Sequence, residues 1–317
     1  MRRPRLLVLA FIVLAPPAIS HGAARPPLPD FAVADRLMPA DPMPERRTQW
    51  PNSAVTLTDV VYSTVPGFRS LHLDLYRRAK DAVALPLVVF LHGGGWAHTN
   101  PRAGAAFKDF PAVLAGLAQR GYAVASIEFR FSGEAPFPAQ LEDLQAAIRF
   151  LRANASRFGI DGAKVGLWGM SSGAQLAALN AMNCIEGTCV QGFVGWFGPY
   201  DLATYMRERP QDLNVRQLFR CSAESCPAAL LDAASPINHV GGKDPPALLV
   251  HGLADTDILP SQSERFAATL RAAGDTAQLL LIPDVTHGLV GATPAATREA
   301  SQRALNATFE FFDHVLR

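Results

Sequence analysis

Gly169-Met170-Ser171-Ser172-Gly173 is the stretch of this sequence that decides the fold. It follows a short apolar run, 164–168, that predicts a buried strand, and it opens an alanine-rich run, 174–182, that predicts a helix. A serine at a sharp turn from strand to helix has a strained backbone that exposes its hydroxyl. A glycine two residues away on either side lets strand and helix cross closely. The pattern predicts that Ser171 is a nucleophile.

A second glycine motif, His92-Gly93-Gly94-Gly95-Trp96, directly follows an apolar run, 87–91, that predicts another strand. Consecutive glycines let the backbone turn two N–H groups toward one point. The tetrahedral intermediate of acyl transfer needs such donors for its oxyanion, and one donor is worth about 3 kcal/mol. Beside the serine turn, this motif predicts an oxyanion hole.

Strand and helix patterns alternate along the rest of the chain. The strands expected after an early antiparallel pair (55–62 and 71–76) are 87–91, 123–127, 164–168, 192–196, 247–250 and 278–282. The expected helices are 109–119, 139–157, 172–182, 261–273 and 297–315. This alternation is typical of an α/β fold with a mostly parallel central sheet and helices on both faces. Ligands bind beyond the carboxyl ends of such strands, where both glycine motifs lie.

The domain organisation follows from composition. Residues 1–20 have a basic start (Arg2, Arg3 and Arg5), an apolar run and small residues at the end, which predicts a signal peptide. Cleavage is expected after Ser20, with cleavage after Ala23 or Ala24 as the alternative. We expect a proline-rich, irregular arm over 21–54 and a catalytic domain over 55–317, with a partly helical, cap-like insertion over 202–240. A secreted or periplasmic protein without a stable membrane anchor after cleavage is predicted. A retained anchor is the alternative, although the apolar run is short for a bilayer.

Charge and cysteines limit the function classes. The chain has 29 basic and 28 acidic residues with no basic stripe, which argues against nucleic acid as a partner. Its four cysteines form two close pairs, 184 with 189 and 221 with 226, which fit an oxidising compartment. Three pairings are possible; proximity favours the two local bridges, with a zinc site as the alternative. No metal or organic cofactor is expected.

A serine nucleophile needs an imidazole base and a carboxylate that holds the imidazole in the right tautomer. In hydrolases with this serine turn, the chain order is serine, acid, histidine. His287, directly after the last expected strand, satisfies that order. The acid belongs in the loop after the preceding strand, where Asp255 and Asp257 are both candidates that periodicity does not separate.

These motifs make the chain resemble the α/β-hydrolase serine esterases of the hormone-sensitive-lipase-like branch, and more closely their acetyl-esterase and feruloyl-esterase-like carboxylesterases. The resemblance covers about 55–317 and rests on both glycine motifs and on the segments 134–143, 159–161, 196–202, 234–237 and 251–263. It implies that Ser171 is the nucleophile, Asp255 the acid and His287 the base. It also implies an oxyanion hole made by Gly94, Gly95 and the N–H of Ser172. The chain departs from the family at Ser172, where alanine is common, and at Ala174-Gln175, where Gly-His is frequent.

The sequence therefore predicts an exported serine carboxylester hydrolase for short-acyl or aromatic-acyl esters, on small molecules or on polysaccharides. Trp96, Trp196 and Phe197 are predicted to border the cleft and bind substrate, with core packing as the alternative. An amidase or peptidase of the same fold, such as an arylformamidase or a prolyl-oligopeptidase-like enzyme, would use the same triad. A non-catalytic binding module on this scaffold is the remaining alternative, and such a module commonly lacks a triad member.

Overall fold

A nine-stranded sheet runs through the described part of the chain, which in this computed structural model is residues 46–317 without 52, 66 and 80–82. The predicted signal peptide, 1–20, and residues 21–45 of the predicted arm lie outside the described residues. The strands are β1 (Arg46–Gln49), β2 (Ala54–Thr64), β3 (Ser70–Arg78), β4 (Leu85–Leu91), β5 (Ala123–Ile127), β6 (Ile160–Met170), β7 (Gly192–Trp196), β8 (Ala247–Gly252) and β9 (Ala277–Ile282). Their order across the sheet is β1-β2-β3-β5-β4-β6-β7-β8-β9.

The sheet is antiparallel at one side and parallel from β5 to β9. β1, β2, β3 and β5 pair antiparallel, and every later pair is parallel. Successive residues of a strand face opposite sides of the sheet, so Leu87 and Val89 belong to one apolar core and Val88 and Phe90 to the other. A strand that is buried on both faces is apolar throughout, which is why the parallel strands were predictable as short apolar runs.

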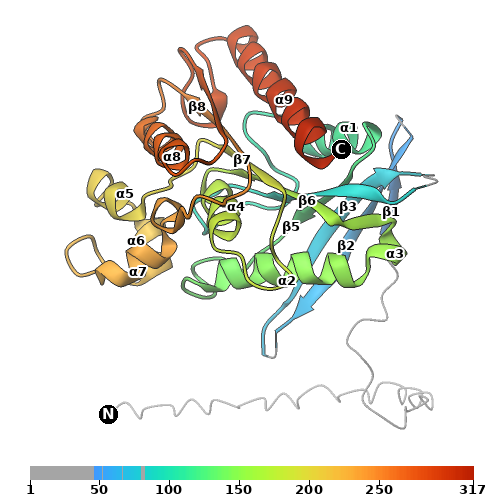
Figure 1. Cartoon of the computed structure of the whole chain (residues 1–317), viewed down its shortest axis with the longest axis horizontal. Helices are drawn as coiled ribbons and strands as arrows, with labels where there is room; N and C mark the ends of the chain where they lie inside the picture. Colours follow the sequence, from blue (N-terminus) through green and yellow to red (C-terminus); the bar gives the residue numbers. More distant parts are fainter. Residues whose placement is uncertain (1–45, 52, 66, 80–82) are drawn as a thin grey trace, which may run out of the picture. The chain divides into compact units, whose positions relative to one another are not determined.

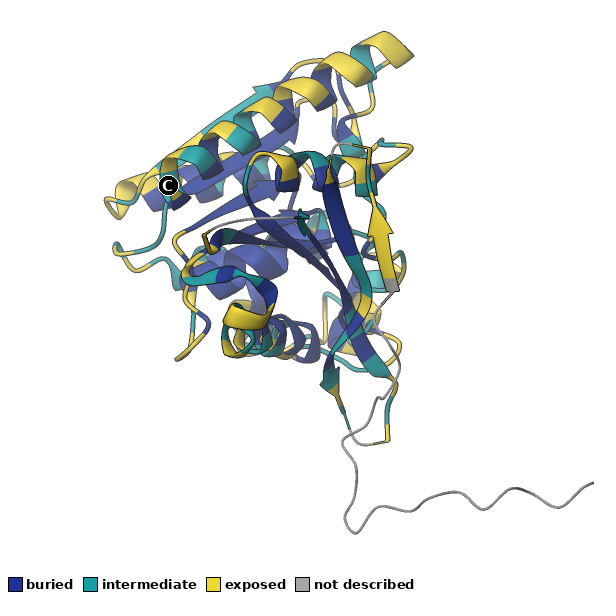
Figure 2. Ribbon diagram, turned by 90° about the vertical axis from the view of Figure 1, so that its right-hand side faces the viewer, coloured by how far each residue is buried: buried dark blue, intermediate teal, exposed yellow. Residues whose placement is uncertain are grey.

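Helices cover both faces. They are α1 (Phe110–Gln119), α2 (Ala139–Ala153), α3 (Ala155–Phe158), α4 (Ser172–Met182), α5 (Leu202–Glu208), α6 (Leu213–Phe219), α7 (Ala228–Ala234), α8 (Ser261–Ala272) and α9 (Pro294–Leu316). α1 and α9 pack on one face, and α2, α4 and α8 on the other (Figure 1). Figure 2 shows the exposed outer surface of the helices and the buried strands between them. Each helix in the described part of the chain is too short or too polar to span a membrane.

Two expectations about local structure were wrong in part. Arg46–Gln49 of the predicted irregular arm forms β1, which pairs with β2 at the edge of the sheet. Its side chains at 47–49 are exposed, so an alternating apolar pattern is missing from the sequence. The helix expected over 139–157 is divided at Asn154 into α2 and α3, where the Asn154 side chain donates to the carbonyl of Phe150 at 2.9 Å.

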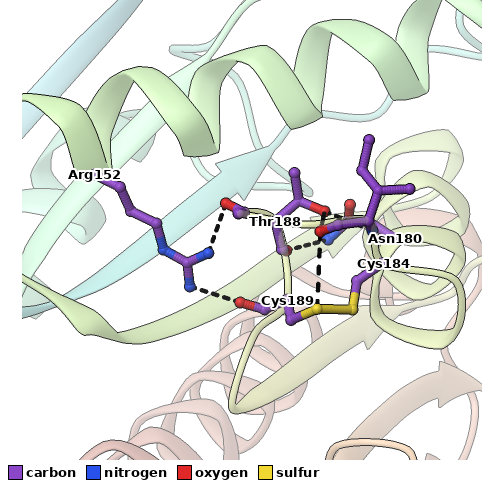
Figure 3. Close-up of a disulfide and its surroundings, with 7 residues drawn as sticks. Arg152, Asn180, Cys184, Thr188 and Cys189 are labelled. Atoms are coloured by element: carbon purple, nitrogen blue, oxygen red, sulfur yellow. Dashed lines mark hydrogen bonds between the residues drawn. A yellow bond between two sulfur atoms is a disulfide. The ribbon is translucent and has the colours of Figure 1, made fainter.

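Two disulfides join Cys184 to Cys189 and Cys221 to Cys226, as proximity predicted. The first closes the loop that follows α4 (Figure 3). Arg152 on α2 donates to two carbonyls of this loop, those of Gly187 and Cys189, both at 2.6 Å. Because Ser171 precedes α4, the bridge fixes the end of the helix that lies away from the serine.

Candidate active site

Ser171 occupies the turn between β6 and α4. Its backbone φ of 52° lies in the left-handed region, which a residue with a side chain adopts only under strain. Gly169 and Gly173 are needed on either side. A Cβ on Gly169 would lie 2.2 Å from the carbonyl oxygen of Gly173, and one on Gly173 would lie 2.3 Å from that of Leu91. The two glycines let α4 start directly against the sheet, as the motif predicted.

The other two predicted triad residues come from loops that follow neighbouring strands. Asp255 lies after β8, and His287 lies after β9. His287 Nε2 is 3.1 Å from Ser171 Oγ, and His287 Nδ1 is 2.7 Å from Asp255 Oδ2. The structure therefore brings together three residues that are 116 and 32 positions apart in the chain.

The surroundings of Asp255 define the tautomer of His287. Burial by itself raises the pKa of this carboxyl, but hydrogen bonds from His251 and His287 outweigh burial and hold the pKa well below its ordinary value. At neutral pH the carboxylate is ionised and only accepts hydrogen bonds. His287 Nδ1 therefore carries a proton, which leaves Nε2 as the acceptor for the hydroxyl of Ser171. The geometry suits proton abstraction from that hydroxyl.

Two of the three residues predicted for an oxyanion hole line the cavity that contains the serine. Gly94 and Gly95 line the same cavity as Ser171. Gly94 has a φ of 106°, and a Cβ there would lie 2.2 Å from the His98 carbonyl oxygen, so the turn requires glycine. Ser172 is the first residue of α4, so its N–H has no acceptor inside the helix and lies at the positive end of the helix dipole.

His92 stabilises the loop that carries these glycines. Its buried ring stacks on Phe129 with 4.4 Å between the ring centroids, and its Nδ1 donates to the Gly93 carbonyl at 2.7 Å. Burial lowers the pKa of His92 to about 4, so the ring is neutral at physiological pH. His92 thus contributes a fixed backbone position at the site rather than a charge.

A cavity of about 810 Å³ opens over Ser171 and His287. One wall is the glycine loop with residues 98–99 and 103–105, and another is the segment from Tyr205 to Asn214 in α5, α6 and their connection. Part of the predicted insertion therefore lies over the serine, whereas α7 is not among the lining elements. The lining residues from the insertion and the acid loop are mostly polar: Tyr205, Glu208, Arg209, Gln211, Asp212, Asn214 and Asp257.

Comparison with known proteins places this chain in a family. The BD-FAE family model matches residues 73–270, which is more than half of the chain. The chain belongs to the BD-FAE family. This membership confirms the resemblance to α/β-hydrolase esterases drawn from the motifs.

Relatives of this BD-FAE chain include two Mycobacterium tuberculosis proteins. Esterase LipQ is 29% identical over 84% of the chain, and Esterase LipC is 32% identical over 74% of the chain. The chain spans 63% and 61% of the lengths of these relatives. Among solved structures, a truncated carbohydrate esterase from gut microbiota is 26% identical with a TM-score of 0.71, and the match covers 84% of this chain and 98% of that one. The "Bifunctional GH43-CE" of Bacteroides eggerthii is 28% identical with a TM-score of 0.70, and the match covers 85% of this chain and 36% of that one.

Two of the three aromatic residues predicted to bind substrate do not reach the cavity of this BD-FAE protein. Trp96 is 2% exposed and donates from Nε1 to Gln175 Oε1 at 3.0 Å, and Trp196 is fully buried and donates to Thr308 Oγ1 at 3.0 Å. Both indoles pack in the core because their N–H groups find buried partners there. Phe197 does line the cavity, and its ring packs edge-on against the ring of His287, with 4.9 Å between the ring centroids.

The sequence departures next to the serine lie in the core. Ser172, Ala174 and Gln175 are all buried and do not line the cavity. Gln175 accepts from Trp96 and donates to the Ala234 carbonyl at 2.7 Å, so it connects the glycine loop to the end of α7. These residues therefore support the site from behind.

Sequence reasoning gave no role to His251, whose ring lies next to the carboxylate of Asp255. Its buried ring is hydrogen-bonded to Ser263 Oγ at 2.7 Å and to the Ile258 carbonyl at 2.9 Å, and its Nε2 is 3.3 Å from Asp255 Oδ2. The signal in the sequence was the spacing of four residues between His251 and Asp255. The side chain of Asp257 is 60% exposed, and its Oδ1 lies 3.4 Å from a guanidinium nitrogen of Arg209.

The described residues contain no group of three or more histidine, cysteine or acidic side chains placed to hold a metal ion. The four cysteines, which could have formed a zinc site, are joined in disulfides.

Proposed function

We propose that the protein is a serine carboxylester hydrolase that works through an acyl-serine intermediate. One observation carries the proposal: Ser171, His287 and Asp255 form a hydrogen-bonded series beside a cavity that Gly94 and Gly95 also line. Membership of the BD-FAE family and similarity to proteins named esterases support it.

In this proposal His287 Nε2 takes the proton of Ser171 Oγ as the oxygen attacks the ester carbonyl. Asp255 stabilises the imidazolium that forms, because its carboxylate is already ionised and lies 2.7 Å from Nδ1. The oxyanion of the tetrahedral intermediate accepts hydrogen bonds from the N–H groups of Gly94, Gly95 and Ser172. Collapse of the intermediate expels the alcohol, which takes the proton from His287.

Deacylation repeats these steps with water. His287 deprotonates the water that attacks the acyl-serine, and the same donors stabilise the second oxyanion. When this intermediate collapses, the proton on His287 returns to Ser171 Oγ and the carboxylic acid leaves. The enzyme is restored, with one water consumed for each ester cleaved.

We further propose that the substrates are short-acyl or aromatic-acyl esters of carbohydrates. The polar wall supplied by Glu208, Arg209, Gln211 and Asn214 suits a hydroxyl-rich alcohol better than a long alkyl chain. Two structural neighbours that are more than 25% identical are named a carbohydrate esterase and a "GH43-CE" protein, which supports this substrate class.

Export is part of the proposal. The basic and apolar segments within residues 1–20 support it, and so do the two disulfides, which persist in oxidising compartments. N-terminal sequencing of the protein recovered from the periplasm or medium tests it. Recovery of the uncleaved chain from the cytoplasm would contradict it.

A substrate panel tests the activity: acetyl, butyryl, octanoyl and feruloyl esters and a formamide, each assayed with the wild type and with Ser171→Ala. We expect acetyl or feruloyl esters to be turned over fastest. Ser171→Ala should lower kcat by about 10⁶.

Ser156→Ala is the matched control, since Ser156 is exposed on α3 away from the site, and it should behave as wild type. Hydrolysis by Ser171→Ala at more than a few per cent of the wild-type rate would exclude Ser171 as the nucleophile. A wild type that cleaves only the formamide would favour the amidase alternative.

A further inference from the structure

Asn214 lies on the wall that the insertion contributes to the active-site cavity. It belongs to the first turn of α6 and lines the same cavity as Ser171 and Gly95. The residue is half-buried, so it contacts the surrounding protein and also faces open space. Asn214 is therefore placed for direct contact with a substrate.

The carboxamide of Asn214 packs against the loop that carries the oxyanion donors. Gly95 has a φ of 61°, and a Cβ added there would lie 2.5 Å from Asn214 Nδ2 and 3.0 Å from Asn214 Cγ. A side chain at position 95 would therefore displace the carboxamide. The insertion thus approaches the oxyanion loop most closely through this one side chain.

Hydrogen bonds fix the backbone of α6 that carries Asn214. Asp212 Oδ1 accepts the N–H of Asn214 at 2.9 Å, and Asp212 Oδ2 accepts the hydroxyl of Tyr205 at 2.7 Å. Near the other end of the helix, the carbonyl of Leu218 accepts the N–H of Phe137 at 3.0 Å. Because the helix is already held in place, contact between Asn214 and a ligand orders little further chain.

The carboxamide of Asn214 is available to a ligand. Other polar side chains of the same wall already have partners, since Tyr205 donates to Asp212 and Arg209 donates to the carbonyl of Thr256 at 2.7 Å. Within the described part of the chain, the side chain of Asn214 makes no hydrogen bond. A half-buried amide of this kind is satisfied by water or by a polar group of a ligand.

Asn214 is close enough to the reacting carbonyl to meet the alcohol that carries the ester. In the proposed mechanism the oxyanion lies about 3 Å from the nitrogen of Gly95. With covalent bonds of about 1.5 Å, Asn214 Nδ2 is then at most about 9 Å from the oxyanion. A hydroxyl on the carbon next to the esterified one, together with a hydrogen bond of about 2.8 Å, spans a distance of this order.

The chemistry of the carboxamide suits a neutral hydroxyl. An amide has N–H donors and a carbonyl acceptor, and a hydroxyl likewise both donates and accepts. An acetyl group has no hydroxyl, so in an acetyl ester the partner belongs to the alcohol. The carboxylates that line the cavity, those of Glu208, Asp212 and Asp257, outnumber the guanidinium of Arg209, which disfavours an anionic substituent.

We propose that Asn214 is a specificity-determining residue that hydrogen-bonds a hydroxyl of the alcohol next to the ester bond. This inference rests on the proposed function and deepens it, because it names the contact that recognises a hydroxyl-rich alcohol. The binding energy of the contact is available only to esters that carry such a hydroxyl. Asn214 therefore favours esters of diols and sugars over esters of simple alcohols.

The test uses two substrates that differ in one hydroxyl, the monoacetate of trans-1,2-cyclohexanediol and cyclohexyl acetate. The measured quantity is the ratio of their kcat/KM values in each variant of the full chain, divided by the same ratio in the wild type, so that the intrinsic reactivity of the two esters cancels. Asn214→Leu keeps a side chain of similar size without its polar atoms. It should lower the ratio about fivefold, which corresponds to about 1 kcal/mol and to the loss of one hydrogen bond. Asn214→Ala should lower the ratio to a similar extent.

Asn306→Leu is the matched control, because Asn306 is an exposed asparagine of α9 outside the residues that line the cavity. It should leave the ratio unchanged. A wild type that cleaves both esters, with a ratio that neither Asn214→Leu nor Asn214→Ala changes, would overturn this inference and leave the proposed function standing.

A wild type that cleaves neither ester would overturn the proposed function, and binding then decides the role of Asn214. An NMR titration measures the dissociation constant of the diol monoacetate with Ser171→Ala and with the double variant Ser171→Ala/Asn214→Leu. The double variant should bind the monoacetate about fivefold more weakly. Equal binding by the two proteins, or no binding by Ser171→Ala, would overturn the inference.

Discussion

Replacement of Asp255 by asparagine should inactivate the enzyme through the tautomer of His287. Asp255 Oδ1 accepts the N–H groups of Asp257 at 2.9 Å and Ile258 at 3.0 Å. An asparagine must keep its carbonyl oxygen there, since its NH₂ would otherwise face two donors. The NH₂ then takes the place of Oδ2 and points a donor at His287 Nδ1, which is 2.7 Å away in the wild type. Nδ1 becomes an acceptor and the proton moves to Nε2.

The magnitude follows from that inversion. A protonated Nε2 cannot take the proton of Ser171, and loss of the correct tautomer in a Ser-His-Asp triad lowers kcat by about 10⁴. A 10⁴-fold loss of kcat corresponds to about 5.4 kcal/mol of lost transition-state stabilisation. Asp257→Asn is the matched comparison. Its carboxylate is 60% exposed and lies 3.4 Å from Arg209, so it should change kcat by less than about tenfold.

The assay is kcat and KM of both variants on one acetyl ester at the same pH, with the free energy of unfolding from urea titration as the control for folding. Folded Asp255→Asn with kcat within a hundredfold of the wild type would refute the tautomer argument. Inactive Asp257→Asn beside active Asp255→Asn would show that the acid is assigned to the wrong aspartate.

Three further predictions concern stability. The buried hydroxyl of Ser172 has no hydrogen-bond partner among the described residues, and leaving such a group unpaired costs about 1–3 kcal/mol. Ser172→Ala should therefore raise the free energy of unfolding, measured by urea titration, by about 1 kcal/mol. A decrease would mean that the hydroxyl has a hydrogen-bond partner. The pKa of Asp255 is lowered in the folded state, so its contribution to stability is fully present above the unfolded pKa of about 3.9 and is lost as pH falls toward the folded value. The difference in free energy of unfolding between wild type and Asp255→Asn should therefore shrink between about pH 5 and pH 2, and a constant difference would argue against the ionised carboxylate. Arg152→Ala should lower the free energy of unfolding by about 2 kcal/mol, because the guanidinium donates hydrogen bonds to the carbonyls of Gly187 and Cys189. It should leave kcat unchanged, because this loop is far from the active site. A change in kcat at unchanged stability would contradict this prediction.

The parts of the fold that the sequence revealed are those that depend on neighbouring residues. The turn at Ser171 needs Gly169 and Gly173 within two positions, and α4 was predicted with the bounds that the structure has. The parallel strands were visible because burial on both faces makes each one an unbroken apolar run. β1 was missed because an exposed edge strand carries no such pattern.

The site itself required tertiary structure wherever the answer depends on distant residues. Asp255 and Asp257 are both aspartates of one loop, and what separates them is that one reaches His287 and the other reaches Arg209. Trp96 and Trp196 looked like substrate contacts beside the motifs, but Gln175 and Thr308, far along the chain, hold their indoles in the core. Local sequence determines strands, helices and turns because their geometry repeats over a few residues. Which side chains meet in a cavity is decided only when the packing of the whole sheet brings its loops to one edge.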